Sequence, residues 1–591
     1  MACHKTASRS ICRDSPVMVS RYLWGFFSYA AFFGTFLLLP SLCFSEKAPY
    51  STFTRDATAA PEVEYYDYIV IGGGTSGCAL AATLSQGSKV LLLERGGLPY
   101  GNPTITNIGG FALTLADVSP SSPSQLFIST DGVINHRARV LGGGSALNAG
   151  FFTRASTQFV QTAGWDPNLV ESSYEWVEKK VAFEPEIKQW QTAVRDGLLN
   201  AGVLPDNGFT YDHLIGTKVG GSIFDKDGHR HTAADLLEYA EPSNIHLLLH
   251  ATVQRILFNP GEKPKSYGVV FEDSKGGNHW AYLNEGSNNE ILVTAGALGS
   301  PQLLMLSGIG PADHLRANGI EVILDQPMVG QGMADNPMNA LLIPSTEPLE
   351  TSLIQTVGIT PFGSFIEAAS GTIELSWARN LPQELLLNQT QQVYGVSREQ
   401  QSEEVKTAVD LYLAKSVQAG IILEKVMGPA SSGHLELKTL DAKDNPEVTF
   451  NYFSDPQDLQ RCVQGMEKVI EVVETSAVSK FRYLTGTIQV YLDTILALPL
   501  NLRPRHLSAA FSLEQFCKDT VMTIWHYHGG CHVNKVVDHN YKVIGIESLR
   551  VIDGSTFYFD SPGTNPQATV MMLGRYMGQK ILKERSTYGR K

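Results

Sequence analysis

The 591-residue sequence lacks the features that mark several special classes of protein. It has no long low-complexity tract and no repeat at the period of a solenoid, which excludes repeat architectures. No run of Lys and Arg stands out and the net charge is −13, so neither nucleic acid nor an anionic membrane is expected as the main partner. The hydrophobic fraction of 43% and the charged fraction of 18% are those of an ordinary globular protein. Because the chain is too long for one compact core, two or more domains are expected.

The N-terminus has the pattern of a secretory signal. Arg13 and Arg21 precede an uncharged apolar run over residues 22–39, and Pro40 and a stretch of small residues ending at Ser45 follow. A basic region, an apolar region and small residues at a cleavage site predict a signal peptide over residues 1–45 and export to the cell exterior or cell wall. The alternative is an uncleaved signal anchor, since the apolar run approaches membrane-spanning length. After cleavage no stable membrane partner is expected.

Cysteine is scarce, and its positions matter because of the secretory route. The signal removes three of the seven cysteines and leaves Cys78, Cys462, Cys517 and Cys531. An oxidising compartment allows one disulfide among these four. A glycosylation sequon begins at Asn388 and is consistent with that compartment.

The first folded element is predicted to be a βαβ unit. Residues 46–63 are polar and contain Pro and Ala, which indicates a linker. A short buried strand over 66–71, a glycine-rich turn over 72–77, a helix of small apolar residues over 78–84 and a second strand over 89–93 follow. Further strands are expected over 290–294 and 549–552, and a helix over 568–582.

The glycine-rich turn has the spacing of a dinucleotide-binding loop. Gly72 permits the tight turn, Gly74 lets main chain approach a pyrophosphate, and Gly77 lets helix and strand pack closely. Glu94 ends the next strand, about twenty residues later, where it can accept hydrogen bonds from ribose hydroxyls. FAD and NAD share this loop, so it does not distinguish them.

Two further glycine-rich segments resemble the signatures of one enzyme family. Residues 138–148 (ARVLGGGSALN) and residues 296–310 (GALGSPQLLMLSGIG) are similar, in this order, to the two signatures of the glucose–methanol–choline (GMC) oxidoreductases. The resemblance runs from about residue 66 to residue 582. The WHYHGG segment over 525–530 and the LGRY segment over 573–576 are most similar to its plant HOTHEAD-like and mandelonitrile lyase-like branch.

The resemblance implies an α/β fold with FAD as cofactor. A Rossmann-like FAD-binding domain would be assembled from discontinuous segments, next to a substrate domain built on an antiparallel sheet. The expected division is a signal peptide over 1–45, a linker over 46–63, FAD-domain parts over 64–155 and 226–336, a connecting or substrate-domain segment over 156–225, the substrate domain over 337–518, and a C-terminal FAD-domain part with the catalytic motif over 519–591. The middle region, roughly 340–515, shows no catalytic pattern.

The resemblance also implies which residues surround FAD. These residues are Gly72, Gly74, Thr75, Ser76, Gly77, Glu94, Arg95, Val140, Gly143, Asn148, Ala149, Gly150, Phe151, Val253, Trp525, His526, Asp553, Gly554, Asn565, Pro566 and Gln567.

The family's catalytic pair falls on His526 and Asn565. Histidine suits a base that removes a hydroxyl proton, and the flavin N5 would accept the hydride. Asn565 can hydrogen-bond the substrate oxygen without titrating. His526, His528, Cys531 and His532 also suggest a metal site, but no second Cys/His cluster completes one, so no metal is expected. Plant relatives imply a Cys462–Cys517 disulfide, with two free thiols as the alternative.

The expected function is therefore oxidation of a small-molecule primary or secondary alcohol, with an electron acceptor as the other partner. The HOTHEAD-like resemblance suggests long-chain ω-hydroxy fatty acids as substrates. A hydroxynitrile (mandelonitrile) lyase is the alternative. Asn565 counts against the alternative, because the lyase branch has a second histidine at that position. A non-catalytic secreted flavoprotein is a third possibility, against which the intact pair argues.

Overall fold

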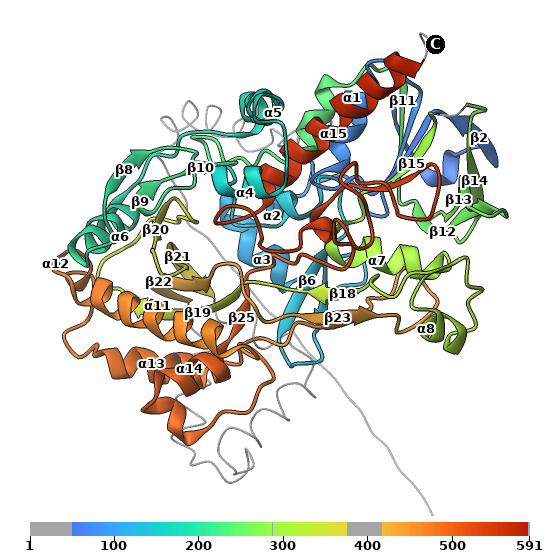
Figure 1. Ribbon diagram of the computed structural model, residues 1–591. Coiled ribbons are helices and arrows are strands. Elements are labelled where there is room, and N and C mark those ends of the chain that lie inside the picture. Colours follow the sequence, from blue (N-terminus) through green and yellow to red (C-terminus); the bar gives the residue numbers. More distant parts are fainter. Residues whose placement is uncertain (1–49, 287, 375–415, 589–591) are drawn as a thin grey trace, which may run out of the picture. The chain divides into compact units, whose positions relative to one another are not determined.

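A computed structural model describes residues 50–286, 288–374 and 416–588 (Figure 1). The predicted signal peptide, its three cysteines and the Asn388 sequon lie outside the described residues. Within the described ranges, none of the helices has the length and apolar content that a membrane crossing requires.

A six-stranded parallel sheet forms the centre of the cofactor-binding part. Its strand order is β1 (Thr54–Asp56), β11 (Ile245–Leu249), β4 (Val90–Leu93), β3 (Tyr68–Ile71), β15 (Glu290–Val293) and β26 (Leu549–Val551). Every residue of β3, β4 and β15 is buried, as expected for parallel strands covered on both faces. Apart from β3 and β4, which form the predicted βαβ unit, neighbouring strands come from distant parts of the sequence, and this confirms a Rossmann-like fold assembled from discontinuous segments.

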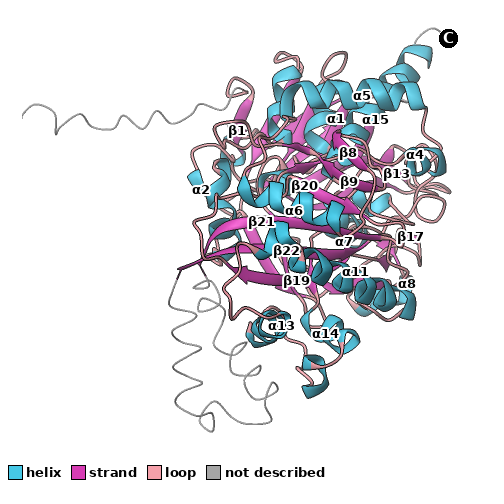
Figure 2. Ribbon diagram, turned by 90° about the vertical axis from the view of Figure 1, so that its left-hand side faces the viewer, coloured by secondary structure: helices cyan, strands magenta, loops and turns pink. Residues whose placement is uncertain are grey.

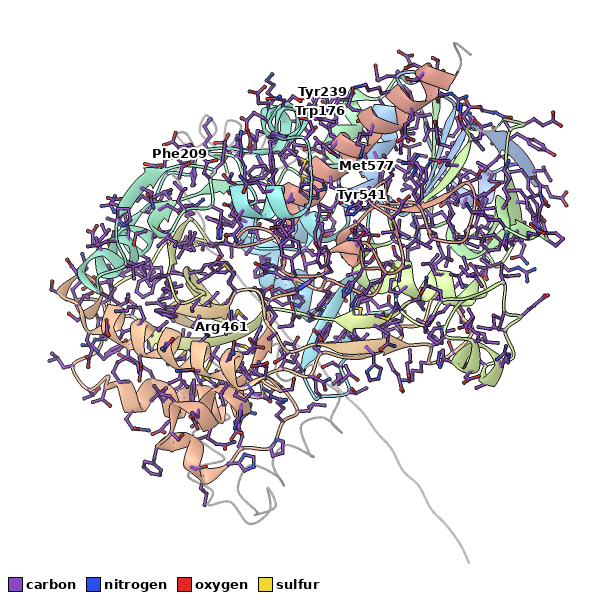
Figure 3. The ribbon with its side chains drawn as sticks, viewed as in Figure 1. Trp176, Phe209, Tyr239, Arg461, Tyr541 and Met577 are labelled. Atoms are coloured by element: carbon purple, nitrogen blue, oxygen red, sulfur yellow. A yellow bond between two sulfur atoms is a disulfide. The ribbon has the colours of Figure 1, made fainter. Side chains whose placement is uncertain are left out.

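Two helices from opposite ends of the chain cover one face of this sheet. Helix α1 (Gly77–Leu84) packs on α15 (Gln567–Tyr588), and the two lie side by side in Figure 1. Helix α5 (Pro167–Val181) packs on α15 in turn. Figure 3 labels Trp176 of α5 and Tyr239, whose ring centroids are 4.5 Å apart. Helix α15 runs past the predicted end at residue 582, since no Gly or Pro interrupts residues 583–588.

The segment expected to be a linker takes part in the fold. Strand β1 pairs in parallel with β11 and forms one edge of the six-stranded sheet. Tyr50 and Phe53 are buried in the core beside it. A three-residue strand is too short to show an alternating pattern in the sequence, and its pairing covers backbone groups that β11 would otherwise expose. The prediction of a linker over 46–63 was therefore wrong for the described part of that segment.

A second sheet has four strands and is formed mainly by residues 252–283. It contains β12 (Thr252–Asn259), β13 (Lys265–Glu272), β14 (Asn278–Leu283) and β2 (Val63–Tyr66). The first three strands form an antiparallel meander, and β2 joins it in parallel. The predicted strand over 66–71 is thus divided, because β2 ends at Tyr66 in this sheet and β3 begins at Tyr68 in the other.

A seven-stranded, mainly antiparallel sheet is the largest sheet among the described residues (Figure 2). Its order is β25 (Met522–Thr523), β19 (Pro337–Pro344), β22 (Ser416–Val426), β21 (Ser364–Glu374), β20 (Thr356–Ile359), β9 (Gly216–Val219) and β8 (Asp206–Phe209). Only the β8–β9 pair is parallel. Helices α6 (Gln189–Asn200) and α11 (Pro456–Glu474) pack on it. The antiparallel sheet expected for the substrate domain is therefore present, and β25 comes from a segment that was assigned to the FAD domain.

Candidate active site

One cavity of about 330 Å³ lies where the parallel sheet meets the seven-stranded sheet. It is lined by every residue that the sequence predicted around FAD except Gly77. These residues are Gly72, Gly74, Thr75, Ser76, Glu94, Arg95, Val140, Gly143, Asn148, Ala149, Gly150, Phe151, Val253, Trp525, His526, Asp553, Gly554, Asn565, Pro566 and Gln567.

The glycine turn after β3 forms one end of the cavity. Gly72 has φ +107°, and a Cβ there would lie 2.6 Å from the Thr294 carbonyl oxygen. A Cβ on Gly77 would collide with the Gly72 carbonyl, so Gly77 serves the packing of the turn and does not line the cavity. A Cβ on Gly74 would meet no atom closer than 3.8 Å. The space beside Gly74 therefore belongs to the cavity, as a loop that receives a pyrophosphate requires.

The first signature segment packs against this turn. The Gly142 amide donates to the Gly73 carbonyl at 2.7 Å. Gly143 has φ +59°, and a Cβ there would lie 2.8 Å from Gly74 Cα. Two glycine-rich backbones thus approach each other without side chains, which leaves a smooth wall for a flat ligand.

Glu94 is a buried carboxylate held by main-chain donors. Its Oε2 accepts from the Gly73 amide at 2.9 Å and its Oε1 from the Gly96 amide at 2.7 Å. Burial raises the pKa of Glu94, and these hydrogen bonds oppose that shift. A carboxylate has about four lone-pair sites. Two of these sites are used here, so Glu94 can still accept hydrogen bonds from ribose hydroxyls.

A hydrogen-bond network joins the first signature to the start of α15. Asn148 Nδ2 donates to Gln567 Oε1 at 2.8 Å, and Gln567 Nε2 donates to the Phe151 carbonyl at 2.6 Å. Arg230 Nη1 donates to Asn148 Oδ1 at 3.1 Å. Segments more than 400 residues apart are thereby fixed on the same wall of the cavity.

Asp553 fixes the second signature. Its Oδ2 accepts from the Gly296 amide at 2.9 Å and from Ser300 Oγ at 2.5 Å, at the first turn of α7 (Gly296–Leu306). A carboxylate at a helix N-terminus satisfies amides that have no partner within the helix. The second signature is therefore held beside β26, next to the cavity.

His526 lies on the cavity wall and its side chain is largely buried. Burial, then the cation of Lys425 and then His528 hold the pKa of His526 well below its ordinary value. The imidazole is therefore neutral near neutral pH and free to take a proton. His528 lies behind it, with Nδ1 3.0 Å from the His526 carbonyl oxygen.

Asn565 lines the same cavity as His526. Its Nδ2 donates to the Phe151 carbonyl at 2.6 Å. Its Oδ1 is buried and has no hydrogen-bond partner among the residues the structure describes. A buried amide oxygen without a partner is costly and indicates a site for a ligand donor.

Two charged residues that line the cavity from the seven-stranded sheet were missed in the sequence. Lys425 Nζ lies 2.9 Å from Glu367 Oε1 and donates to the Thr564 carbonyl at 3.2 Å. Both side chains are almost fully buried, and both residues line the cavity from β22 and β21. The middle region, in which the sequence showed no catalytic pattern, therefore contributes side chains to the cavity. Lysine is rarely buried without a partner, so Lys425 at the end of an apolar strand was the sequence signal that could have indicated this contribution.

The four described cysteines form one disulfide, between the pair that the resemblance implied, and two free thiols. Cys462 of α11 and Cys517 of α14 (Leu513–Thr520) form a disulfide with a Cα–Cα distance of 6.5 Å. Cys78 and Cys531 are free and buried. Across the described part of the chain, no group of three or more His, Cys, Asp or Glu side chains is arranged to hold a metal ion.

The features of the cavity fit FAD. The glycine cradle at Gly74 and Gly143 accepts a pyrophosphate, Glu94 suits a ribose, and the smooth wall suits a ring system. His526 and Asn565, the pair expected to be catalytic, line the same cavity.

Comparisons with known proteins agree with this assignment. Family profiles described as GMC oxidoreductase match residues 66–338 and 429–574. The protein HOTHEAD of Arabidopsis thaliana is 51% identical over 531 residues, which cover 88% of each chain. The (R)-mandelonitrile lyase-like protein of the same plant is 48% identical over 549 residues, 90% of this chain and 92% of that one. Sinalpyl alcohol oxidase Nec3 of Nesocodon mauritianus is 41% identical, over 95% of this chain and 97% of that one.

Solved structures show the same fold at low sequence identity. Formate oxidase of Aspergillus oryzae superposes with a TM-score of 0.69 at 17% identity, covering 89% of this chain and all of that one. Pyridoxine 4-oxidase from Mesorbium loti gives a TM-score of 0.67 at 20% identity, covering 87% and 98%. The chain therefore belongs to the GMC oxidoreductase family, in its plant HOTHEAD-like branch, and is an FAD-dependent alcohol oxidoreductase.

Proposed function

We propose that this protein oxidises a primary or secondary alcohol, with His526 as the base and Asn565 as the residue that holds the substrate oxygen. One observation carries the proposal. His526 and Asn565 come from loops about forty residues apart and line the same cavity as the glycine cradle. FAD, when bound in this cavity, supplies the acceptor for the hydride.

The environment of the pair supports these roles. The low pKa of His526 keeps its imidazole neutral, so a ring nitrogen can take the hydroxyl proton. Asn565 uses one donor on the Phe151 carbonyl, and its Oδ1 has no partner among the described residues. The second N–H of the Asn565 amide is therefore left to donate to the substrate oxygen, whose own proton goes to His526.

We extend the proposal to a hydrophobic hydroxylated substrate and to the secretory pathway. Long-chain ω-hydroxy fatty acids are the substrates that the HOTHEAD-like motifs of the sequence imply, and the similarity to a sinalpyl alcohol oxidase supports aromatic alcohols. The basic and apolar N-terminal sequence supports secretion, and the buried Cys462–Cys517 disulfide is consistent with an oxidising compartment.

A second candidate is a hydroxynitrile lyase, which is favoured by the mandelonitrile lyases of Prunus among the relatives, at 38–40% identity. Cyanide release needs acid and base assistance. Asn565 supplies neither, so the oxidation proposal has the stronger support.

The test is anaerobic reduction of the bound flavin by a panel of ω-hydroxy fatty acids and aromatic alcohols. A substrate should bleach the visible flavin band, and His526→Ala should keep FAD but bleach roughly 10²–10⁴-fold more slowly. Asn565→His should retain some redox activity. Ready cyanide release from mandelonitrile by a wild type that no alcohol bleaches would replace this proposal with the lyase.

A further inference from the structure

A buried carboxylate lies directly behind the segment that carries His526. Asp335 follows β18 (Gln331–Met333), precedes β19 and is 2% exposed. Its Oδ1 accepts from the His526 amide at 2.8 Å, and its Oδ2 accepts from Tyr452 Oη and Thr523 Oγ1, each at 2.6 Å. No ion pair within the described ranges includes Asp335. A carboxylate buried among neutral donors is costly to keep, which points to a task beyond stability.

The same hydrogen bonds fix an uncommon backbone conformation next to His526. Trp525 has φ +62°, in the left-handed region that a bulky residue rarely adopts. Its amide donates at 2.8 Å to Thr523 Oγ1, which itself donates to Asp335. Asp335 therefore holds both ends of the bend that turns Trp525 and His526 into the cavity.

The sheet explains why a side chain is needed at this point. Strand β25 pairs with β19 through Thr523 and Pro337, and Ala334 and His528 exchange two backbone hydrogen bonds of 2.9 Å. Between these two pairings residues 524–527 face only residues 335–336, so the regular ladder is interrupted. The amide of His526 would then have no backbone partner, and the Asp335 carboxylate supplies the missing acceptor.

We propose that Asp335 is a positioning residue that sets the place of His526 for proton removal from the alcohol. The inference rests on the proposed function. Asp335 does not line the cavity, so it acts through His526 and not on the substrate. A displacement of about 1 Å in a reacting group can cost about 10²-fold in rate, so loss of this anchor should be visible in kinetics.

Hydrogen exchange of the FAD-loaded protein tests the anchor without using activity. In Asp335→Ala, the amides of the peptide covering residues 522–528 should exchange faster than in the wild type, while those of the parallel sheet should not change. Thr523→Val removes the hydroxyl that joins Asp335 to Trp525 and should have a smaller effect of the same sign. Unchanged exchange of this peptide in both variants would overturn the proposal.

A double-mutant cycle tests whether Asp335 acts through His526. Asp335→Ala should lower the limiting rate of anaerobic flavin reduction by about 10- to 100-fold. In the His526→Ala background the same change should have almost no further effect, because the group being positioned is absent. A merely structural role would lower the rate by the same factor in both backgrounds, and that outcome would refute positioning.

Two further variants complete the design. Asp335→Asn keeps an acceptor for the His526 amide and should recover most of the rate. If Asp335→Ala fails to retain FAD, Asp335→Asn replaces it in the hydrogen-exchange and kinetic measurements. Asp458→Ala is the matched control, since Asp458 is an equally buried carboxylate that contacts Ser431 and Arg461, away from this segment. It should show no coupling with His526. If no alcohol reduces the wild type, the proposed function fails, and hydrogen exchange still decides whether Asp335 anchors the segment.

Discussion

At the scale of single residues, the charge on His526 is controlled by its neighbours. Burial is the largest cause of its lowered pKa, and Lys425 is the next. Glu367 forms an ion pair with Lys425, and His528 Nδ1 contacts the carbonyl of His526. Asp335 accepts a hydrogen bond from the backbone amide of His526. A cation disfavours the imidazolium form, so the base remains deprotonated down to acidic pH. The rate of flavin reduction should therefore stay nearly constant through the neutral range.

Removal of the Lys425 charge should shift this pH dependence. In the double variant Lys425→Met/Glu367→Gln no buried charge is left unpaired. Without the cation the pKa of His526 should rise, so the pH at half-maximal flavin reduction should move upward. The measurement is the limiting anaerobic reduction rate from about pH 4 to pH 9.

Lys218→Met is the control for this experiment. Lys218 is also fully buried in the same sheet, but it contacts Thr153 Oγ1 and does not line the cavity. It should leave the pH midpoint where it is. An unchanged midpoint in the Lys425 double variant would show that burial alone sets the pKa of His526.

At the scale of elements, the disulfide links two helices next to the segment that carries His526. Helix α14 leads directly into β25 and the Trp525–His526 bend, and α11 packs on the seven-stranded sheet. Cys462 and Cys517 are separated by 55 residues, so their bond restricts a long loop in the unfolded chain. Such a restriction typically stabilises a fold by about 2–4 kcal/mol.

Cys462→Ala/Cys517→Ala should therefore lower the free energy of unfolding by about 2–4 kcal/mol in urea titrations. Cys531→Ala removes a buried free thiol and is the matched control. If the double variant and Cys531→Ala lower the free energy of unfolding equally, the disulfide stabilises the fold only through the packing of its sulfur atoms.

At the scale of the whole molecule, the cavity joins segments that span most of the sequence. The turn at Gly74, the Asn148 network and the loop of Asn565 all contribute walls. A ligand that binds only this assembled cavity stabilises the fold by mass action, by about 2.7 kcal/mol at a free concentration of 100 times Kd. FAD should therefore protect the folded part as a whole.

Gly74→Val should abolish this protection. The backbone of Gly74 needs no left-handed conformation, and a Cβ there has room, so the variant should fold. Its side chain would fill the space intended for the pyrophosphate, and the purified protein should be colourless with a lower Tm that added FAD does not raise. Gly261→Val, in an exposed loop, should remain yellow. A yellow Gly74→Val protein would mean that the pyrophosphate lies elsewhere.

The sequence alone determined the parts of this protein whose chemistry is local. A glycine turn between a strand and a helix, an acid at the end of the next strand and two long signatures predicted the FAD fold, and all but one of the residues expected around the cofactor line one cavity. These motifs are readable because each needs a particular residue type at a fixed spacing for a backbone reason.

Only the tertiary structure decided which groups surround the proposed catalytic pair. Asp335, Glu367 and Lys425 belong to no local motif, and they reach His526 and the Asn565 loop through strands paired across long sequence separations. The edge strand β1 was likewise invisible, because three residues carry no periodicity. Contacts of this kind depend on register and on pairing between distant strands, which no window of sequence contains.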